Sequence, residues 1–303
     1  MKYAAFIICF ERPRALIRYI DILRAQSSPP DYILIVDNSL DDSVEKLNLN
    51  KKFPEVNYFK IGYNSGPAGG AKHGLRRLKE LNYKWVFWAD DDNPPRDNQV
   101  CAGLFTCVEK LEKQGVPLGI IGGKGGLFNK WTGSIQSLSN RQLRKKDIVE
   151  VDMVPGGHSL LVNTDYLIEK TYPEEKLFFA FEDLDICLKF KKQGARIFVD
   201  AKSWYKKRQL DGNVKQSYRY QKMKDEKPKD LKREYFSSRN LLFILNQNKY
   251  YLAIGINISK IIFKSIISFR HGLKHGRKFV FYQYKAIFDF LSGNYSFNVP
   301  LKK

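Results

Sequence analysis

Apolar runs alternate with helical patterns along the first ninety residues of the chain. Four short hydrophobic segments, typical of buried strands, occupy residues 3–10, 32–37, 56–61 and 84–89. The segments between them place apolar residues at helical spacing or open on glycines. Nearly continuous apolar strands separated by helices predict a mostly parallel sheet with helices on both faces. In such a sheet, ligands bind beyond the carboxyl ends of the strands.

The remainder of the chain continues this alternation and then changes character. We expect a helix over 97–115, a strand over 117–123, a polar irregular stretch over 124–150 and a strand with a glycine kink over 151–163. The stretch 176–194, "KLFFAFEDLDICLKFKKQG", leads into a further helix, and a last strand covers 195–200. The pattern divides the chain into a catalytic-type domain over 1–205, a basic, mobile loop over 206–233 and a helical region over 234–303.

The positive charge is concentrated in the last third of the chain. The whole sequence carries a formal net charge of +20, and residues 206–303 hold 22 Lys and Arg against 6 Asp and Glu. The first two thirds are therefore nearly neutral. This distribution indicates an anionic partner for the C-terminal region, such as a membrane surface or a phosphorylated molecule.

The cysteines and the N-terminus favour a reducing compartment. Cys9, Cys101, Cys107 and Cys187 form no CxxC pair and lie in apolar segments, so we expect free buried thiols. The opening "MKYAAFIICFERPR" becomes charged too early for a signal peptide and fits a first strand better. Both features point to the cytoplasm.

Three aspartates follow the fourth predicted strand in "KWVFWADDDNPP". Asp90, Asp91 and Asp92 could hold a hard divalent cation that bridges phosphate oxygens. They could equally cap the next helix or be solvated. Their place at the end of a strongly apolar strand, where the ligand of such a sheet lies, favours the first interpretation.

Two other segments contribute candidate residues at the same edge. Asp37 ends the second predicted strand, where it could accept a hydrogen bond from a nucleobase or simply form a turn. "GYNSGPAGGAKHG", residues 62–74, could bring backbone N–H groups close to a phosphate or form an ordinary helix start.

A third acidic cluster opens a predicted helix. "FEDLDICLK" places Glu182, Asp183 and Asp185 in its first turn, where the helix dipole alone favours carboxylates. Behind an apolar "LFFAF", the same residues could supply a general base whose pKa burial raises.

The order of these motifs resembles glycosyltransferase family 2, whose members are inverting enzymes with the GT-A fold. The similarity is strongest to bacterial galactofuranosyl- and rhamnosyltransferases of surface-glycan assembly. It rests on "IVDNS", "GPAGGAKHGL", "WADDDNPP", "VPGGHSLLV", "FFAFEDLDICLK" and "YFSSRNLLFIL", in that order. It covers about residues 3–246 and implies a Rossmann-like, mostly parallel sheet followed by the basic helical region.

The resemblance implies a role for each motif. Asp183 would be the general base, supported by Glu182 and Asp185, and Asp92 with Asp90 would bind Mn²⁺ or Mg²⁺. The residues expected to contact the UDP- or dTDP-sugar are Asp37, Asn64, Gly69, Gly70, Asp90, Asp91 and His158. The implied reaction moves galactofuranose or rhamnose to a hydroxyl of a glycan, expected to be lipid-linked.

One feature departs from the family pattern. Many relatives place a metal-binding histidine shortly after the strand that follows the base, and this sequence reads "DAKSWYKKRQL" there. Either fewer protein ligands hold the metal or a lysine partly substitutes for its charge.

The last third mixes apolar runs with basic residues from Lys260 to Lys278. Because charges interrupt the apolar stretch, we expect an amphipathic helix in the interface of an anionic membrane rather than a spanning segment. The enzyme would then lie at the cytoplasmic face of the cell membrane. The alternative is a helical bundle packed on the catalytic domain or on a second subunit.

Two other functions fit the sequence less well. A metal-dependent nucleotidyltransferase would carry a glycine-rich basic signature after the first strand, where this chain has "FERPRALI". A nucleic-acid-binding protein would interleave basic and aromatic residues across its body, which here is nearly neutral with acidic strand ends. We therefore expect no nucleic-acid partner.

Overall fold

The computed structural model describes residues 2–157, 159–212 and 230–295, and these form two compact units. The first unit comprises Met1–Leu127, Ser137–Glu175 and Glu182–Asp211, and the second comprises Phe128–Gln136, Lys176–Phe181 and Gly212–Lys303. The two units therefore differ from the domains predicted from the sequence, which had a single boundary after residue 205. Two short segments from the middle of the chain belong to the second unit.

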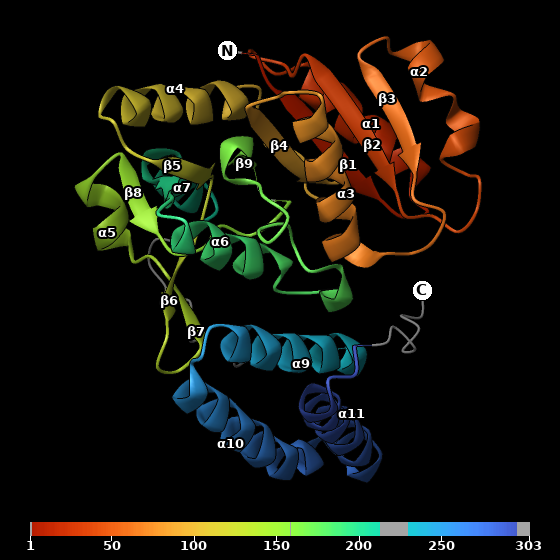
Figure 1. Cartoon of the computed structure of the whole chain (residues 1–303), viewed down its shortest axis with the longest axis vertical. Helices are drawn as coiled ribbons and strands as arrows, with labels where there is room; N and C mark the ends of the chain where they lie inside the picture. Colours follow the sequence, from red (N-terminus) through yellow and green to blue (C-terminus); the bar gives the residue numbers. More distant parts are fainter. Residues whose placement is uncertain (1, 158, 213–229, 296–303) are drawn as a thin grey trace. The chain divides into compact units, whose positions relative to one another are not determined.

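An eight-stranded sheet forms the centre of the first unit (Figure 1). Its strand order is β3-β2-β1-β4-β9-β5-β10-β8. Strands β9 and β8 run antiparallel to their neighbours, and the other six run parallel, so the sheet is mostly parallel as predicted. The strands are β1 (Ala4–Cys9), β2 (Tyr32–Asp37), β3 (Val56–Lys60), β4 (Trp85–Asp90), β5 (Leu118–Gly122), β8 (Ile148–Val151), β9 (Leu160–Asn163) and β10 (Arg196–Asp200).

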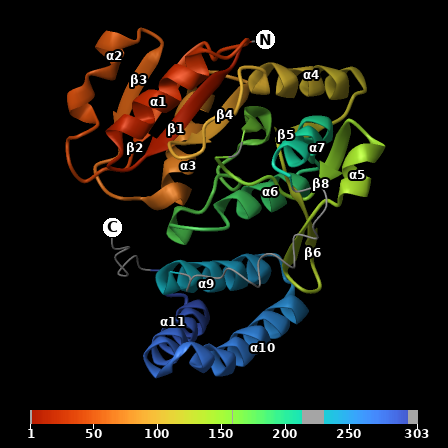
Figure 2. The same ribbon diagram turned by 180° about the vertical axis from the view of Figure 1, so that it is seen from behind.

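Helices cover both faces of this sheet because successive strand residues point to opposite sides. Ala5 and Ile7 of β1 join the core cluster beneath α1 (Pro13–Arg24) and α4 (Val100–Lys113). Phe6 lies on the other side, against Gly74 of α3 (Gly66–Glu80), where a Cβ would come within 2.6 Å of the Phe6 ring. Figure 2, turned from the view of Figure 1, shows α1 and α3 on opposite faces. All four cysteines are buried and free, as predicted.

Two local predictions for the first unit are wrong. The stretch 151–163 is not one strand, because β8 ends at Val151 and β9 begins at Leu160. Pro155 and two glycines interrupt it, with Gly157 at φ +66°. The expected loop over 206–233 is shorter at both ends, since α7 (Ala201–Leu210) and the helix beginning at Leu231 extend into it, while residues 213–229 lie outside the described part.

The remaining elements of the chain are short. Asp200 caps α7 by accepting a hydrogen bond from the Ser203 N–H at 2.9 Å, a helix start that the polar sequence of α7 did not reveal. The short elements are η1 (Glu45–Leu47), α2 (Leu49–Lys52), β6 (Gly126–Asn129), β7 (Ser134–Ser137), α5 (Asn140–Lys145), η2 (Thr164–Tyr166), η3 (Glu175–Leu177) and α6 (Glu182–Lys192), the last of which carries the acidic cluster.

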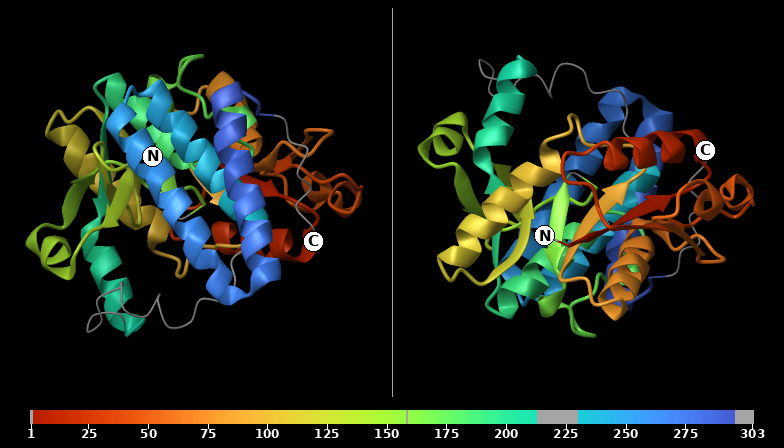
Figure 3. Two further views of the ribbon diagram at one scale, coloured as in Figure 1. Left: turned by 90° about the horizontal axis from the view of Figure 1, so that it is seen from below. Right: turned by 90° about the horizontal axis from the view of Figure 1, so that it is seen from above.

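Three long helices dominate the second unit, and each contacts the other two: α9 (Leu231–Gln247), α10 (Tyr251–Ile267) and α11 (Leu273–Ser292). In Figure 3 they form the cyan-to-blue group. The short helix η4 (Ser268–His271) follows α10, and Gly272, at φ +98°, separates it from α11. The basic apolar stretch is therefore two helices joined at a glycine.

Candidate active site

The carboxyl ends of three parallel strands bring two predicted site residues to one edge of the sheet. In the β1–β2 pairing Cys9 lies opposite Asp37, and in the β1–β4 pairing Ile8 lies opposite Asp90. Asp37 and Asp90 therefore end the two strands that flank β1, at nearly the same level. This is the edge at which parallel α/β sheets bind ligands.

Asp37 has a full set of partners within the fold. Its side chain is buried, with Oδ2 accepting from the Tyr58 hydroxyl at 2.7 Å and Oδ1 from the Ser39 N–H at 2.8 Å. Asn38 extends this junction by accepting from the Ser65 hydroxyl at 2.7 Å. Asp37 thus fixes the turn after β2, and its contact with the nucleobase of a donor stays a prediction.

The glycines that open α3 serve helix packing. A Cβ on Gly69 would lie 2.3 Å from the Cβ of Ser65, and one on Gly70 would lie 2.8 Å from a methyl group of Ile8. Both glycines are buried and closely packed, and their contact with a sugar nucleotide stays a prediction. Asn64 is half-buried and its side chain accepts from the Gly66 N–H at 3.0 Å.

The three aspartates after β4 lie in three different environments. Asp91 is buried and forms an ion pair with Arg12 at 2.6 Å, whereas the side chain of Asp92 is 59% exposed and contacts the same guanidinium at 3.3 Å. Asp90 is half-buried at the strand end. The sequence singled out the aspartates but not Arg12, which neutralises part of their charge.

A proline–glycine–glycine segment connects Asp90 to the acidic helix start. A Cβ on Gly157 would lie only 2.2 Å from Oδ2 of Asp90, so only glycine leaves room for this carboxylate. The Gly156 N–H donates to Oδ2 of Asp183 at 3.2 Å. Asn93 donates to the Gly157 carbonyl at 2.7 Å. The predicted donor contact His158 lies outside the described residues.

Asp183 stands at the start of α6 with its carboxylate oriented by backbone N–H groups. Oδ1 accepts from its neighbour Leu184 at 2.7 Å, and Oδ2 accepts from Gly156. The adjacent Glu182 is different, because its buried Oε2 has no hydrogen-bond partner. Asp185 points elsewhere, toward Lys189 at 2.8 Å and the Glu174 N–H at 3.1 Å, so it secures the loop before the helix.

Burial and mutual repulsion raise the pKa values of this group of carboxyls. Burial, with repulsion from its acidic neighbours, raises the pKa of Asp90 to about 7. Burial also raises the pKa values of Glu182 and Asp183, and the charge of Asp183 raises that of Glu182 further. Because two N–H groups and Lys124 favour ionised Asp183, we infer that Asp183 ionises before Glu182. This order of ionisation agrees with the prediction that Asp183 is the general base and that Glu182 supports it.

Strained backbone immediately precedes this helix. Phe178, Ala180 and Phe181 adopt positive φ angles of 61°, 71° and 68°, which are unusual for residues with side chains. Such a conformation persists only where the surroundings hold it. The apolar "LFFAF" is therefore a shaped loop that sets the position from which α6 begins.

Asn240 of α9 holds this loop. It is fully buried, and its Nδ2 donates to the carbonyls of Leu177, Phe179 and Ala180 at 2.8, 2.7 and 3.1 Å. Arg239 is also fully buried; it donates to the Leu177 carbonyl at 3.3 Å and to Oδ1 of Asn240 at 3.0 Å. The sequence contained the Arg-Asn pair, but only the fold connects it to the loop over 177–180.

A divalent cation would find oxygen ligands of the right kind here. Asp90 and Asp92 offer carboxylates, and their crowding is the arrangement that a cation relieves. Among the described residues, no group of three or more Asp, Glu, His or Cys side chains is arranged to hold a metal. The carboxylates of Asp90 and Asp92 are thus the oxygen ligands that this edge of the sheet offers to a divalent cation.

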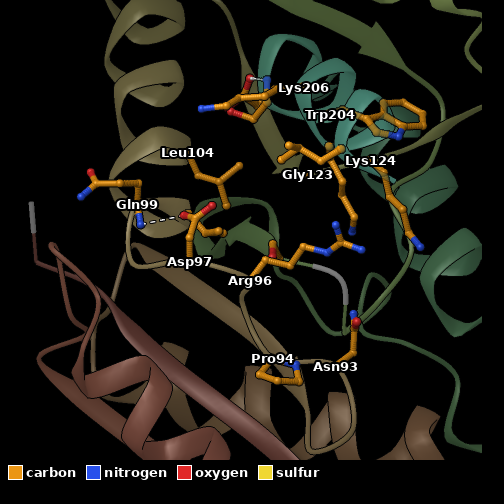
Figure 4. A pocket seen from close by; sticks show the side chains of 16 residues that line it. Asn93, Pro94, Arg96, Asp97, Gln99, Leu104, Gly123, Lys124, Trp204 and Lys206 are labelled. Carbon is orange, nitrogen blue, oxygen red and sulfur yellow. Dashed lines mark hydrogen bonds between the residues drawn. The ribbon is translucent and has the colours of Figure 1, made fainter. Parts of the chain in front are cut away.

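A cavity of about 460 Å³ lies in the same unit, lined from α4, the segment after β5 and α7 (Figure 4). Asn93 and Ser159 belong to its lining, on either side of the glycine segment. Four of its lining residues are cationic: Arg96, Lys124, Lys206 and Lys207.

The sheet order, the helices on both faces and the acidic strand ends define a GT-A fold. Two solved structures are similar to it. One is GalNAc-T7 with UDP, GalNAc and Mn²⁺, with TM-score 0.53 and 16% identity, covering 66% of this chain and 42% of that chain. The other is S. aureus TarS 1–349, with TM-score 0.50 and 14% identity, covering 97% and 92%.

Residues 4–169 match the family model described as "Glycosyl transferase family 2". The chain belongs to this family and is a glycosyltransferase. The two alternative functions considered from the sequence, a nucleotidyltransferase and a nucleic-acid-binding protein, are therefore wrong. Galactofuranosyltransferase GlfT1 of Mycobacterium tuberculosis is 33% identical over 108 residues, 35% of each chain. GlfT1 of Mycolicibacterium smegmatis is 31% identical over 104 residues, 34% of each. The alignments thus span about a third of these relatives.

Replacing Asn240 tests the coupling between α9 and the base. Asn240→Ala leaves three loop carbonyls without their donor, so we expect a loss of about 2–3 kcal/mol in the free energy of unfolding. We also expect kcat to fall at least tenfold at a temperature where the variant is folded, because Asp183 loses its position. Denaturant unfolding and steady-state kinetics measure these effects.

Asn246→Ala is the matched control, because Asn246 is exposed on the same helix and should change stability by less than about 0.5 kcal/mol. An Asn240 variant that unfolds more easily but keeps full kcat would show that the contact only stabilises the fold.

The pH dependence of transfer tests the raised pKa of Asp183. Since the base acts only when ionised, kcat/KM should fall about tenfold per pH unit below its apparent pKa, which burial raises above the usual carboxyl range. Lys124 favours the ionised form, so Lys124→Met should move this acidic limb to higher pH. Lys202→Met, on the exposed surface of α7, should leave it in place. A limb that moves downward in Lys124→Met would contradict the assignment.

Proposed function

We propose that this protein is an inverting glycosyltransferase that moves galactofuranose, with rhamnose as the second choice, from a UDP- or dTDP-sugar to a hydroxyl of a glycan acceptor. The orientation of Asp183, beside Asp90 and held by the Gly156 and Leu184 N–H groups, is the observation that carries this proposal. The sugar assignment is supported by similarity to two galactofuranosyltransferases.

The proposed reaction is a single displacement. Asp183 accepts the proton of the acceptor hydroxyl while the oxygen forms a bond to the anomeric carbon. The bond from that carbon to the diphosphate breaks on the opposite side, and the nucleoside diphosphate leaves with the electron pair. The configuration is inverted, and no covalent enzyme intermediate forms. Glu182, kept protonated by burial, does not compete with Asp183 for this proton.

Asp92 and Asp90 would hold Mn²⁺ or Mg²⁺, which supplies positive charge to the departing diphosphate. The structurally similar GalNAc-T7 was solved with UDP and Mn²⁺, and TarS with UDP, which supports a nucleotide-sugar donor. Arg12 contacts Asp92 and would have to release it in part. Asn64 and Asp91 remain proposed contributors to the donor site, Asp91 by holding Arg12.

The second unit supports a peripheral location on an anionic membrane at its cytoplasmic face. Eleven of the seventeen exposed large apolar side chains in the described residues lie between Tyr251 and Leu291. Lys260 and Lys264 are exposed beside them. Within the described part, Tyr251–His271 is the single stretch long and apolar enough to cross a membrane, with 22% buried. The two lysines inside it favour the interface, as does an acceptor that carries a lipid.

Two substitutions separate chemistry from donor binding. Asp183→Asn should lower turnover by at least about a thousandfold and leave UDP affinity within about threefold, because the amide cannot take the proton. Asp92→Ala should instead weaken donor binding. We expect UDP affinity to fall about tenfold when Mn²⁺ is present and to change little in EDTA. Calorimetry and a coupled UDP-release assay measure both. Near-normal turnover in Asp183→Asn would remove Asp183 as the base.

Vesicle flotation tests the membrane proposal. We expect the protein to float with vesicles containing about 30% anionic lipid and to dissociate in high salt, because the attraction is partly electrostatic. The double variant Phe263→Ser/Phe288→Ser removes two exposed aromatic anchors, 64% and 67% exposed, and should reduce flotation at least about fivefold. Phe→Ser at these exposed positions leaves the core intact. Retention in the membrane after carbonate extraction would instead indicate a spanning helix.

A further inference from the structure

The basic cavity beside the catalytic carboxyls has a chemistry that the reaction scheme does not use. Its four cations come from segments far apart in sequence: Arg96 precedes α4, Lys124 follows β5, and Lys206 and Lys207 lie on α7. Figure 4 shows Arg96, Lys124 and Lys206 among the side chains that line it. Lys124 and Lys207 are half-buried, so their charges are directed into partly dehydrated space.

These cations are only partly neutralised by the protein. Arg96 pairs with Asp211 at 2.6 Å. Lys124, Lys206 and Lys207 form no ion pair with any residue of the described chain. Burial and mutual repulsion lower the pKa values of Lys124 and Lys207. Like charges gathered in this way are favourable only when an anion joins them.

The acidic residues of the lining offset only part of this charge. Asp200 directs Oδ1 to the Ser203 N–H at 2.9 Å, as a helix cap. Asp97 is exposed, and its Oδ1 accepts from the Gln99 N–H at 2.9 Å. Four cations against two occupied carboxylates leave a net positive cavity. Leu104 and Trp204 supply an apolar wall.

The cavity lies near Asp183. Lys124 is close enough to lower the pKa of Asp183, so one cation connects the cavity to the group that takes the acceptor proton. The lining comes from the segments that follow β4 and β5 and from the end of β10, whereas Asp37 ends β2, on the other side of β1. A group held here would lie toward the β5 and β10 side of the sheet, away from β2.

We propose that this cavity binds a phosphate or pyrophosphate group of the acceptor, with Lys124 and Lys207 as its principal contacts, and so positions the acceptor hydroxyl at Asp183. The proposal rests on the proposed glycosyl transfer and adds a chemical class to its acceptor, which is a glycan that carries a phosphate ester or a pyrophosphate. Lysine and arginine side chains are the groups that proteins use to bind such anions.

Anion binding to the full chain tests the site without turnover. Inorganic pyrophosphate is titrated in EDTA with UDP in excess, so that UDP competes for the donor site. Lys207→Met should weaken pyrophosphate binding about tenfold, since one charge-assisted hydrogen bond is lost. Lys207→Arg should restore it to within about threefold. Lys202→Met, on the same helix but outside the cavity, is the matched control and should bind as the unmodified protein does. Lys124→Met should also weaken pyrophosphate binding and provides a second, independent test.

Kinetics then identify the source of the phosphate. The KM of Lys207→Met should rise about tenfold for an acceptor that bears a phosphate ester and stay unchanged for the same glycoside without it, with kcat unchanged. UDP affinity should stay the same. Equal weakening of UDP and pyrophosphate would assign the cavity to the donor diphosphate, and pyrophosphate binding unaffected by both lysine variants would remove the site; either result overturns the proposal. Pyrophosphate binding without turnover on any acceptor would instead count against the glycosyl transfer.

Discussion

Repulsion among carboxyl groups in a partly dehydrated space is the constraint on which the site depends. Asp90 ends β4 and Asp183 begins α6, and each raises the energy of the other's ionised form. Glu182 adds a third carboxyl beside them. All three cannot be ionised unless positive charge is near. The protein supplies some through Lys124 and Arg12. The divalent cation of the proposed reaction would supply more, so the same crowding that costs stability prepares the site for a charged substrate.

Small residues make this crowding geometrically achievable. Gly157 has no side chain, so the Asp90 carboxylate can lie against it. Gly156 donates its N–H to Asp183, and a side chain on Gly156 would meet the Trp88 ring. In the second unit, Asn240 holds the strained loop that precedes α6 in the chain. Within its own unit, the orientation of the Asp183 carboxylate comes from the Gly156 and Leu184 N–H groups.

The sequence allowed prediction of those features that depend on local pattern. Apolar strands, the aspartates at their ends and the acidic start of α6 follow from periodicity and from the rule for parallel sheets. Features made by distant residues could not be predicted. The role of Asn240 depends on carbonyls some sixty residues away in the chain, and the lysines of the cavity meet only in the fold. Gly69 and Gly70 show a third case, since a glycine required for packing and one required for a ligand look the same in sequence.

The contact between Asn240 and the loop limits which segments of this enzyme can be exchanged with those of a relative. The family match ends at residue 169, before the base, and the loop that positions the base is held from α9. A chimera that exchanged the C-terminal helices with those of a relative would separate Asn240 from the carbonyls that it fits. Residues 176–181 and α9 should therefore be exchanged together, although they lie far apart in the chain.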